Sequence, residues 1–542
     1  MRYSIALWFA LSLLSVQAQE KPAQIQQEGN AGSAPLSFAE LVTLSSTAKP
    51  EGRLATKLES LLATPSVHND ATAEGAQPRR PAVEGLGPVL RVGLWNIERG
   101  LKFELIRAAL TDTNDFEQVA GEQGGIDASR KDLIESQLAT LQNVDILVLN
   151  EVDLGMKRTE YRDVARQLAV ALHMNYAYGV EFVEVDPVFA LGTEEVHLPE
   201  VQQDRRLQQD LQVHRDLYRG LHGTAILSRY PIRSARILRL PMCYDWYGEE
   251  VKDIAKVEKG KRWAAQKLFK ERIAREVRRG GRMALIAEVG IPQLPTGEAT
   301  IVATHLENRC KPACRLRQME TLLANLKQDR NPLVIAGDLN TTGKSNTPTS
   351  LRNEITRRVT DYQFWIRQGV SHFHPLGIYQ HVLFPVHYFH GYQDPTAFHF
   401  PILWDNRERP LFTTMRKFRF EDERALDFRG DPGRSLQHRS RTLSDSNDRG
   451  AKGFVPTYAF ARDYRGLVGR FKLDWILVKP LEESGSQAQS TVFAPRFPKT
   501  MRELNESVAN RIADHAPMTV DLPLPEQPMS PQPMSPSGGI RR

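Results

Sequence analysis

The dominant feature of this 542-residue sequence is a series of short apolar runs, each followed or led by a polar residue that can bind metal or transfer protons. The length and apolar character of the runs predict buried β-strands. A single acid at the end of a strand is usually an ordinary solvated carboxylate, so the prediction depends on the recurrence. The runs are RVGLWNIERG, VDILVLNEVD, ATIVATHLEN, PLVIAGDLNTT, KLDWILV and ADHAPMTVDLPL.

The polar residues at these strand ends form a chemically coherent set. Asp338 and Asn340 stand two apart, so their side chains face the same way from a strand end. Taken together, the runs supply acids and an amide for a hard cation, two histidines, and an acid able to orient a histidine, which is the inventory of metal-assisted hydrolysis. The full set is Asn96, Glu98, Glu151, His305, Asp338, Asn340, Asp474, Asp514 and His515.

At these residues the chain resembles the endonuclease/exonuclease/phosphatase superfamily, which includes deoxyribonuclease I, AP endonucleases, neutral sphingomyelinases and inositol polyphosphate 5-phosphatases. The resemblance is carried, in the family's order from Trp95 to Met518, by WNIE, LNEVD, GTAILSRYPI, THLE, GDLN, LDWILV and DHAPM. It implies an α/β fold, a four-layer sandwich of two packed mixed β-sheets flanked by helices, with large insertions. It also implies that the site lies where the strand ends converge.

The resemblance assigns metal-binding roles to one group of these residues. Glu151 would anchor Mg²⁺ or Mn²⁺, ions that take only one or two protein carboxylates, and Asn96 would be the matching amide. Glu98 falls where some members have a second acidic ligand and others do not, and Asp514 is the candidate for a second metal. For Glu98 and Asp514 the alternative is local hydrogen bonding.

The same resemblance assigns the proton-transfer and phosphate-binding roles. His515, held by Asp474, would be the general base, because a carboxylate partner orients the imidazole and stabilises its charged form. His305 would donate to a phosphate oxygen or protonate the leaving group. Asp338 would position the nucleophilic water or bind metal, and Asn340 would donate to the phosphate.

Two positions in the NEVDLGMKRT run depart from the family pattern or extend it. Asn150 replaces a frequent Gln and keeps the amide. Arg158 is open to two interpretations: it binds the substrate phosphate through two parallel hydrogen bonds, or it pairs with Asp153.

The N-terminal sequence indicates export. Residues 1–18 combine a basic start at Arg2, an apolar run from Ile5 to Leu14 and a small-residue exit at Ala18, which is typical of a cleaved signal peptide. An uncleaved anchor is the alternative, but the run is shorter than the ~20 residues of a membrane span. No later segment is long and apolar enough to cross a bilayer, so the expected location is secreted or periplasmic.

The expected domain organisation has four parts. After the signal peptide, residues 19–88 combine linkers with two short helices between Ser37 and Leu62, broken at Lys49-Pro50-Glu51-Gly52. Residues 89–523 form the catalytic domain, with insertions at about 241–282 and 343–454. Residues 524–542 are a Pro-rich, disordered tail.

The first insertion is strongly basic. Val251–Arg282 contains twelve Lys or Arg against four Asp or Glu, whereas the whole chain has a net charge of +6. Roughly helical apolar spacing, from Ile254 to Val277, leaves the basic residues on an outer face. Such a helix would contact nucleic acid or anionic lipid through phosphates, or it is simply a solvated helix.

The second insertion is rich in histidine and aromatic residues. A helix is expected near Leu351–Gln368, and six of the 14 histidines lie between His372 and His399. Their spacing matches no standard zinc pattern, so the alternatives are the core of a small subdomain, aromatic stacking on a ligand, or a second metal site. Arg407–Gly450 is charged and predicts a surface loop.

Three cysteines, Cys243, Cys310 and Cys314, exclude a disulfide-dependent scaffold. In an oxidising compartment Cys310 and Cys314 would be the pair that closes CKPAC, with Cys243 the odd thiol. The alternative is that they stay unpaired.

These observations favour a secreted, divalent-metal-dependent phosphoester hydrolase, most simply a phosphodiesterase acting on nucleic acid or a phospholipid head group. A phosphomonoesterase of the inositol-phosphate type is the alternative, although the PxWCDR-type run of that branch is missing before Asp474. A non-catalytic extracellular binding module on the same scaffold is the third possibility, and retention of the full set of ligand types argues against it.

Overall fold

The computed structural model describes residues 35–126, 128–185, 213–252, 277–341, 407–426, 449–450, 453–459, 470–482, 491–492, 496–508 and 511–525. Several predicted features lie outside these residues: the signal peptide, the helix at 351–368, the histidine-rich segment 372–399 and the tail from residue 526. No helix of the described part is long and apolar enough to span a bilayer.

Two mixed β-sheets form the centre of the molecule. The first has the order β1-β5-β6-β4-β3-β20-β19, with β2 added on β3 and β8 on β5. Its strands are β1 (Ser66–His68), β2 (Ala82–Val83), β3 (Gly87–Arg99), β4 (Ile146–Leu154), β5 (Asn175–Val185), β6 (Leu221–Ser228), β8 (Val277–Gly280), β19 (Arg496–Thr500) and β20 (Met518–Pro523). The parallel pair β3–β4 carries two of the predicted motifs side by side.

The second sheet has the order β16-β11-β10-β9-β7. Its strands are β7 (Ile232–Arg239), β9 (Met283–Gly290), β10 (Glu298–His305), β11 (Leu333–Asp338) and β16 (Asp474–Lys479). Strands β10 and β11 are parallel, and His305 is directly opposite Asp338 in their register. The remaining short strands pair locally: β12 (Arg449–Gly450) with β13 (Gly453–Phe454), β14 (Tyr458–Ala459) with β15 (Arg470–Phe471), and β17 (Leu481–Glu482) with β18 (Thr491–Val492).

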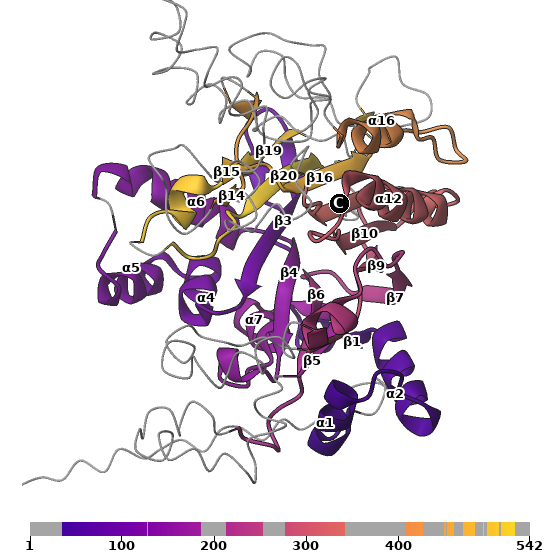
Figure 1. Ribbon diagram of the computed structural model, residues 1–542. Helices are drawn as coiled ribbons and strands as arrows, with labels where there is room; N and C mark the ends of the chain where they lie inside the picture. The colour runs from indigo at the N-terminus through magenta and orange to yellow at the C-terminus, as the bar shows by residue number, and fades with distance from the viewer. Residues whose placement is uncertain are drawn as a thin grey trace, which may run out of the picture.

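Helices cover the outer faces of both sheets. Figure 1 shows α4 (Phe103–Thr111) and α5 (Thr113–Glu122) on one side, and α12 (Pro312–Leu326) and α16 (Arg409–Lys417) on the other. Helices α6 (Lys131–Gln142) and α7 (Val164–Leu172) pack into the core of the first side. The result is the expected four-layer α/β sandwich with two packed mixed sheets.

Burial on both faces explains why the strands read as continuous apolar runs. Along β3, Val92 and Leu94 belong to the core between the sheets, whereas Trp95 and Ile97 belong to the core under the helices. Successive side chains of a strand point to opposite faces, so a strand covered on both sides needs apolar residues at every position. Each fully buried side chain of this kind contributes about 1.5–3 kcal/mol.

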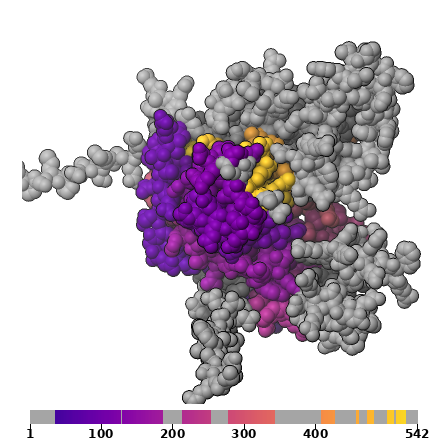
Figure 2. All heavy atoms as spheres, turned by 90° about the vertical axis from the view of Figure 1, so that its left-hand side faces the viewer, coloured from indigo at the N-terminus to yellow at the C-terminus, as the bar shows by residue number. Residues whose placement is uncertain are grey.

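The two ends of the catalytic domain lie side by side. Strand β20 pairs antiparallel with β3, which places Met518 opposite Leu94. In Figure 2 the yellow C-terminal segment accordingly lies against the indigo-to-purple N-terminal half. This pairing brings the last motif, DHAPM, next to the first, WNIE.

The N-terminal helices are confirmed as α1 (Phe38–Ser46) and α2 (Gly52–Ala63). A capping box between Ser37 and Glu40 begins α1. The following segment, 64–88, contains more than the linker suggested by its composition, since β1 forms an edge strand on β5 and α3 (Asp70–Ala73) follows it. The side chain of Asn69 hydrogen-bonds both the N–H and the C=O of Ile232, which attaches the segment to β7.

The outer helix predicted for Val251–Arg282 is wrong at its C-terminal end. There the chain is strand β8, which pairs with β5, and Val277 is buried. Arg279 donates to the carbonyls of Leu44 and Ala48 at the end of α1, at 3.0 Å each. Backbone pairing and these carbonyl acceptors hold the arginine inside. Residues 253–276 lie outside the described part of the chain.

The surface loop predicted for Arg407–Gly450 is also wrong at its start. Residues Arg409–Lys417 are helix α16, which buries Leu411 and Phe412 against the second sheet. The preceding Glu408 is fully buried and accepts from Nε of Arg315 on α12 at 2.9 Å. Part of the charge that suggested a surface loop, that of Glu408, therefore lies in the interior, paired with Arg315.

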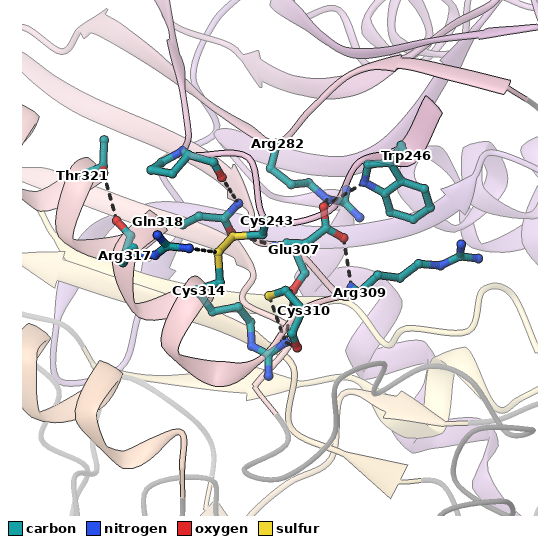
Figure 3. Close-up of a disulfide and its surroundings, with 12 residues drawn as sticks. Cys243, Trp246, Arg282, Glu307, Arg309, Cys310, Cys314, Arg317, Gln318 and Thr321 are labelled. Carbon is teal, nitrogen blue, oxygen red and sulfur yellow. Dashed lines mark hydrogen bonds and ion pairs between the residues drawn. A yellow bond between two sulfur atoms is a disulfide. The ribbon is translucent and has the colours of Figure 1, made fainter. Parts of the chain in front are cut away.

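The predicted Cys310–Cys314 disulfide is contradicted as well. Cys243 and Cys314 form the disulfide, with Cα atoms 5.9 Å apart, and Cys310 is a buried free thiol (Figure 3). The first turn of α12 presents Cys314 to the loop that holds Cys243, and one turn further Gln318 donates to the carbonyl of Pro241 at 2.9 Å. Tertiary packing, rather than proximity along the chain, decides the pairing.

Candidate active site

The polar strand ends leave the sheets through irregular backbone. The β3–β4 register shifts between Asn96 and Arg99, and the β4–β6 register shifts between Leu149 and Val152. Glu98, Glu151 and Asn340 have left-handed backbone, with φ of 48°, 52° and 51°. Such conformations cost about 1–3 kcal/mol for a non-glycine residue and collect at functional sites, where a bulge redirects a side chain.

Asp338, at the end of β11, lies at the centre of a cluster of mostly buried polar side chains, which we call the pocket. Its Oδ2 lies 3.3 Å from Nδ2 of Asn96, 3.6 Å from Nε2 of His305 and 3.7 Å from Nε2 of His515. Nδ2 of Asn96 is in turn 3.4 Å from Oε1 of Glu151. One pocket therefore contains side chains from both sheets, separated by up to 419 positions in the sequence.

Hydrogen bonds from neighbouring strands fix Asp338 in place. Oδ1 of Asn150 accepts from the backbone N–H of Asp338 at 2.9 Å, which joins the two sheets directly. The N–H of Asn340 donates to Oδ1 of Asp338 at 2.8 Å, and its side-chain amide donates to the carbonyl of Leu306 at 2.9 Å. The amide of Asn340 thus has one hydrogen engaged by the fold and one left for a ligand.

His515 and Asp474 form the predicted histidine–carboxylate pair. Nδ1 of His515 lies 2.7 Å from Oδ2 of Asp474, and both side chains are buried. The hydroxyl of Thr457 accepts from the backbone N–H of Asp474 at 3.1 Å. Burial alone would lower the pKa of His515, but the carboxylates of Asp474 and Asp514 raise it well above its usual value.

Three carboxylates gather on the open side of the same pocket. Burial would raise the pKa of Glu151, but Arg99, His305 and His222 hold it at about 2. Its negative charge and burial together raise the pKa of Glu98. Partial desolvation and the charges of Glu98 and Glu151 raise the pKa of Asp514 to about 8, although its side chain is 35% exposed.

Glu98, Glu151 and Asp514 supply carboxylate oxygens, the ligand type of a hard divalent cation, but in this structure they do not form a compact group of ligand atoms. Glu98, Glu151 and Asp514 repel one another, and a bound cation would relieve that repulsion through oxygen ligands of the type that Mg²⁺ and Mn²⁺ prefer. Among the described residues, Asp338, Asp474 and His515 are the one group of three acids or histidines whose ligand atoms all lie within 4.8 Å of one another. Because Oδ2 of Asp474 lies 2.7 Å from Nδ1 of His515, we interpret these two residues as a proton-transfer pair and not as metal ligands.

Two residues that the sequence patterns did not identify support His305. Nη1 of Arg282 lies 2.7 Å from Nδ1 of His305 and 2.7 Å from Oε2 of Glu181. A guanidinium only donates, so Nδ1 accepts and the proton of a neutral His305 is on Nε2, facing Asp338. Glu181 was detectable as an acid inside the apolar strand NYAYGVEFVEV, whereas Arg282 was assigned to an outer basic face.

Arg158 forms an ion pair with Asp153, which was the second of its two predicted roles. Its Nε and Nη2 donate to the two carboxylate oxygens of Asp153 at 2.6 and 2.7 Å. Nη2 is also 2.8 Å from Oε2 of Glu184. Because the Nε–Nη2 edge of the guanidinium donates to these carboxylates, this edge does not serve as a phosphate clamp in the structure.

One comparison with known proteins identifies a family. A sequence model described as the Endonuclease/Exonuclease/phosphatase family matches residues 93–515. No curated protein matches the chain.

Similar solved structures include an endonuclease/exonuclease/phosphatase from Beutenbergia cavernae DSM 12333, at 15% identity and a TM-score of 0.35, covering 82% of this chain and 73% of that one. Another is the human Nocturnin catalytic domain with bound sulfate anion, at 15% identity and 0.35, covering 83% and 98%. A third is the 3' phosphatase NExo from Neisseria bound to product DNA hairpin, at 13% identity and 0.34, covering 80% and 99%.

The family match spans most of the catalytic domain and includes the residues of the pocket from Asn96 to His515. The chain belongs to the Endonuclease/Exonuclease/phosphatase family, a family of phosphoester hydrolases.

Proposed function

We propose that the protein is an exported, Mg²⁺- or Mn²⁺-dependent phosphodiesterase in which His515, oriented by Asp474, activates a water molecule. The observation that carries the proposal is the buried 2.7 Å contact between these two residues, with Nε2 of His515 facing Asp338 and Asn96. A histidine held in this way has one nitrogen fixed and the other available for proton transfer.

The residues of the pocket divide the reaction among them. A cation that neutralises Asp514 would remove part of the negative charge that raises the pKa of His515. Nε2 of the neutral ring then takes a proton from water as the water oxygen bonds to phosphorus and the ester P–O bond breaks. Asp338 holds the water, and Nε2–H of His305 donates to a phosphate oxygen or to the departing oxygen. A divalent cation held by Glu98, Glu151, Asp514 and Asn96 would neutralise charge on the phosphate oxygens.

Buried polar atoms without partners argue against a non-catalytic binding module. Among the described residues, Nε2 of His305, Oδ1 of Asn340 and Oδ1 of Asp474 have no hydrogen-bond partner. Leaving such atoms unsatisfied costs about 1–3 kcal/mol each, and a bound phosphoester and its water would satisfy them.

Nucleic acid and phospholipid head groups are the two proposed substrate classes. The basic insertion favoured nucleic acid, but Arg279 and Arg282 at its end are buried, and Arg278 pairs with the buried Glu184. These three arginines therefore do not support a nucleic-acid surface, and the argument from the basic charge of the insertion is weaker.

The test is hydrolysis of DNA, RNA, sphingomyelin, phosphatidylinositol and inositol phosphates by the purified mature protein, with Mg²⁺ or with EDTA. We expect release of product from at least one diester with Mg²⁺ and none with EDTA. Cleavage of inositol phosphates alone would favour the phosphomonoesterase alternative. Inactivity on the whole panel would contradict the proposed function.

Export is part of the proposal. It is supported by the signal-like residues 1–18 and by the Cys243–Cys314 disulfide, since disulfides persist mainly in oxidising compartments. N-terminal sequencing of the protein from periplasm and medium should give a mature chain that starts near Gln19. A chain that keeps Met1 and stays in the cytoplasm would contradict it.

A further inference from the structure

His222 is a third histidine on the inner face of the first sheet. It lies on β6, opposite Asp153 of β4 and Phe182 of β5. Two positions further along the same face of β6, Thr224 donates to Oε1 of Glu181 at 2.6 Å and accepts from Asn150 at 3.3 Å. Because residues two apart on a strand share a face, His222 continues the polar network of the pocket along β6.

Asp153 holds the ring of His222 in one orientation. Nδ1 of His222 lies 2.9 Å from Oδ1 of Asp153, which is fully buried. The same carboxylate accepts both hydrogen bonds from Arg158, so it is fixed from its other side. This arrangement repeats that of His515, whose Nδ1 also rests on a buried carboxylate.

The hydrogen-bond partners of His222 and His305 favour opposite tautomers of the two neutral rings. A carboxylate paired with arginine only accepts, so Nδ1 of His222 carries the proton and Nε2 of the neutral ring has a lone pair. In His305, by contrast, Nδ1 accepts from Arg282 and Nε2 donates.

Nε2 of His222 is open to a ligand. No described residue hydrogen-bonds it, and it is not among the ring nitrogens sealed from solvent, as Nε2 of His305 is.

We propose that Nε2 of His222 accepts a hydrogen bond from a hydroxyl group of the substrate, next to the phosphoester that His305 and His515 act on. The proposal rests on the proposed function and narrows its substrate class. It favours esters of hydroxyl-bearing groups, such as ribose or inositol, over esters that lack a nearby donor. A buried polar acceptor left unpaired by the wrong substrate is the physical source of such selectivity.

Two matched substrate pairs test the selectivity: RNA against DNA oligonucleotides of one sequence, and phosphatidylinositol against phosphatidylcholine. In the pair that the wild type hydrolyses, His222→Phe should lower kcat/KM for the hydroxyl-bearing member about tenfold or more and change the other less than about twofold. His222→Gln, which keeps an acceptor oxygen, should recover part of the loss. His214→Ala, on an exposed residue, is the control.

The outcomes separate this inference from the function on which it rests. A wild type inactive on all four substrates contradicts the proposed function. An active wild type whose His222→Phe and His222→Gln variants melt like the wild type and lose activity equally on both members of a pair, or not at all, contradicts the role of His222. If His222→Phe melts early, the His222→Gln comparison decides between the same two results.

Discussion

At the residue scale, the pocket depends on how His515 is held. His515→Ala should lower kcat about 10²- to 10⁴-fold, because it removes the group that takes the proton from water. Asp474→Asn should have an effect in the same direction, since a neutral amide lacks the negative charge that stabilises the protonated ring of His515. Steady-state kinetics on the best substrate of the panel measure both, with melting temperatures to show that the variants fold.

An unchanged kcat in a folded His515→Ala variant would remove the base assignment. The exposed His214 provides the matched control, because His214→Ala deletes an imidazole outside the pocket.

A second residue-scale prediction concerns Glu250, which is 8% exposed and accepts from the N–H of Arg278 at 3.0 Å. Burial raises the pKa of Glu250 to about 7. Between a pH equal to the ordinary glutamate pKa and pH 7, the folded state therefore binds more protons than the unfolded state. The contribution of Glu250 to the free energy of unfolding falls as the pH rises through that range. The loss amounts to at most about 3 kcal/mol.

Urea unfolding between pH 5 and pH 8 measures this contribution. The free energy of unfolding of Glu250→Gln should fall less over this range than that of the wild type. Glu249→Gln, at a neighbouring side chain that is 43% exposed, should follow the wild type. Identical pH profiles for all three proteins would contradict the prediction.

At the element scale, helix α12 and the loop after β7 are joined by the Cys243–Cys314 disulfide (Figure 3). Trp246 begins the helical segment directly after this loop, and its Nε1–H donates to Glu307 at 2.9 Å. Glu307 is the last residue of the THLE motif, two positions after His305. The disulfide therefore stabilises the segment that packs against this motif.

Alkylation of the denatured, unreduced protein tests the pairing. Only Cys310 should be labelled, as mass spectrometry of its peptides would show, and in the native protein even Cys310 should react slowly because burial raises its pKa to about 11. Label on Cys243 without reduction would restore the pairing first predicted from the sequence.

Removal of the disulfide should also reduce stability. Cys243→Ser opens a link across 71 positions, which should lower the free energy of unfolding by about 2–4 kcal/mol. Cys310→Ala deletes only the free thiol and is the matched control; a larger loss there than in Cys243→Ser would contradict the assignment.

At the scale of the whole molecule, each sheet supplies half of the site. The first sheet brings Asn96, Glu98 and Glu151, and the second brings His305 and Asp338. Asp514 and His515 lie in the loop before β20, a strand of the first sheet. Any cation bound between these groups therefore couples metal binding to the packing of the two sheets.

Metal binding should consequently stabilise the fold. Mg²⁺ at a hundred times its dissociation constant should add about 2.7 kcal/mol, seen as a higher melting temperature that EDTA reverses. Glu151→Gln should remove most of the shift, whereas Glu288→Gln, on an exposed position of β9, should keep it. A melting temperature that is insensitive to Mg²⁺ in the wild type would contradict the cation site.

The sequence by itself determined the strands, their order of motifs and the fold class. This was possible because the strands are buried on both faces, as Val92 and Trp95 of β3 show. A strand buried on both faces needs apolar residues at successive positions, so it is visible in the sequence as a continuous apolar run. It also determined the residue types of the pocket, since hydrolysis needs acids, amides and imidazoles at strand ends.

Tertiary structure alone decided which groups meet. The partners of His305 are Arg282 and Glu181, the partner of Arg158 is Asp153, and the partner of Cys314 is Cys243. The partners of His305 and Cys314 depend on contacts between elements distant in sequence, and local charge or spacing carries no information about them. For Arg158, whose pairing with the nearby Asp153 was one of two interpretations of the sequence, the fold decided between the two. For that reason the arginines of a basic segment, which composition places in solvent, became the interior counter-ions of buried carboxylates.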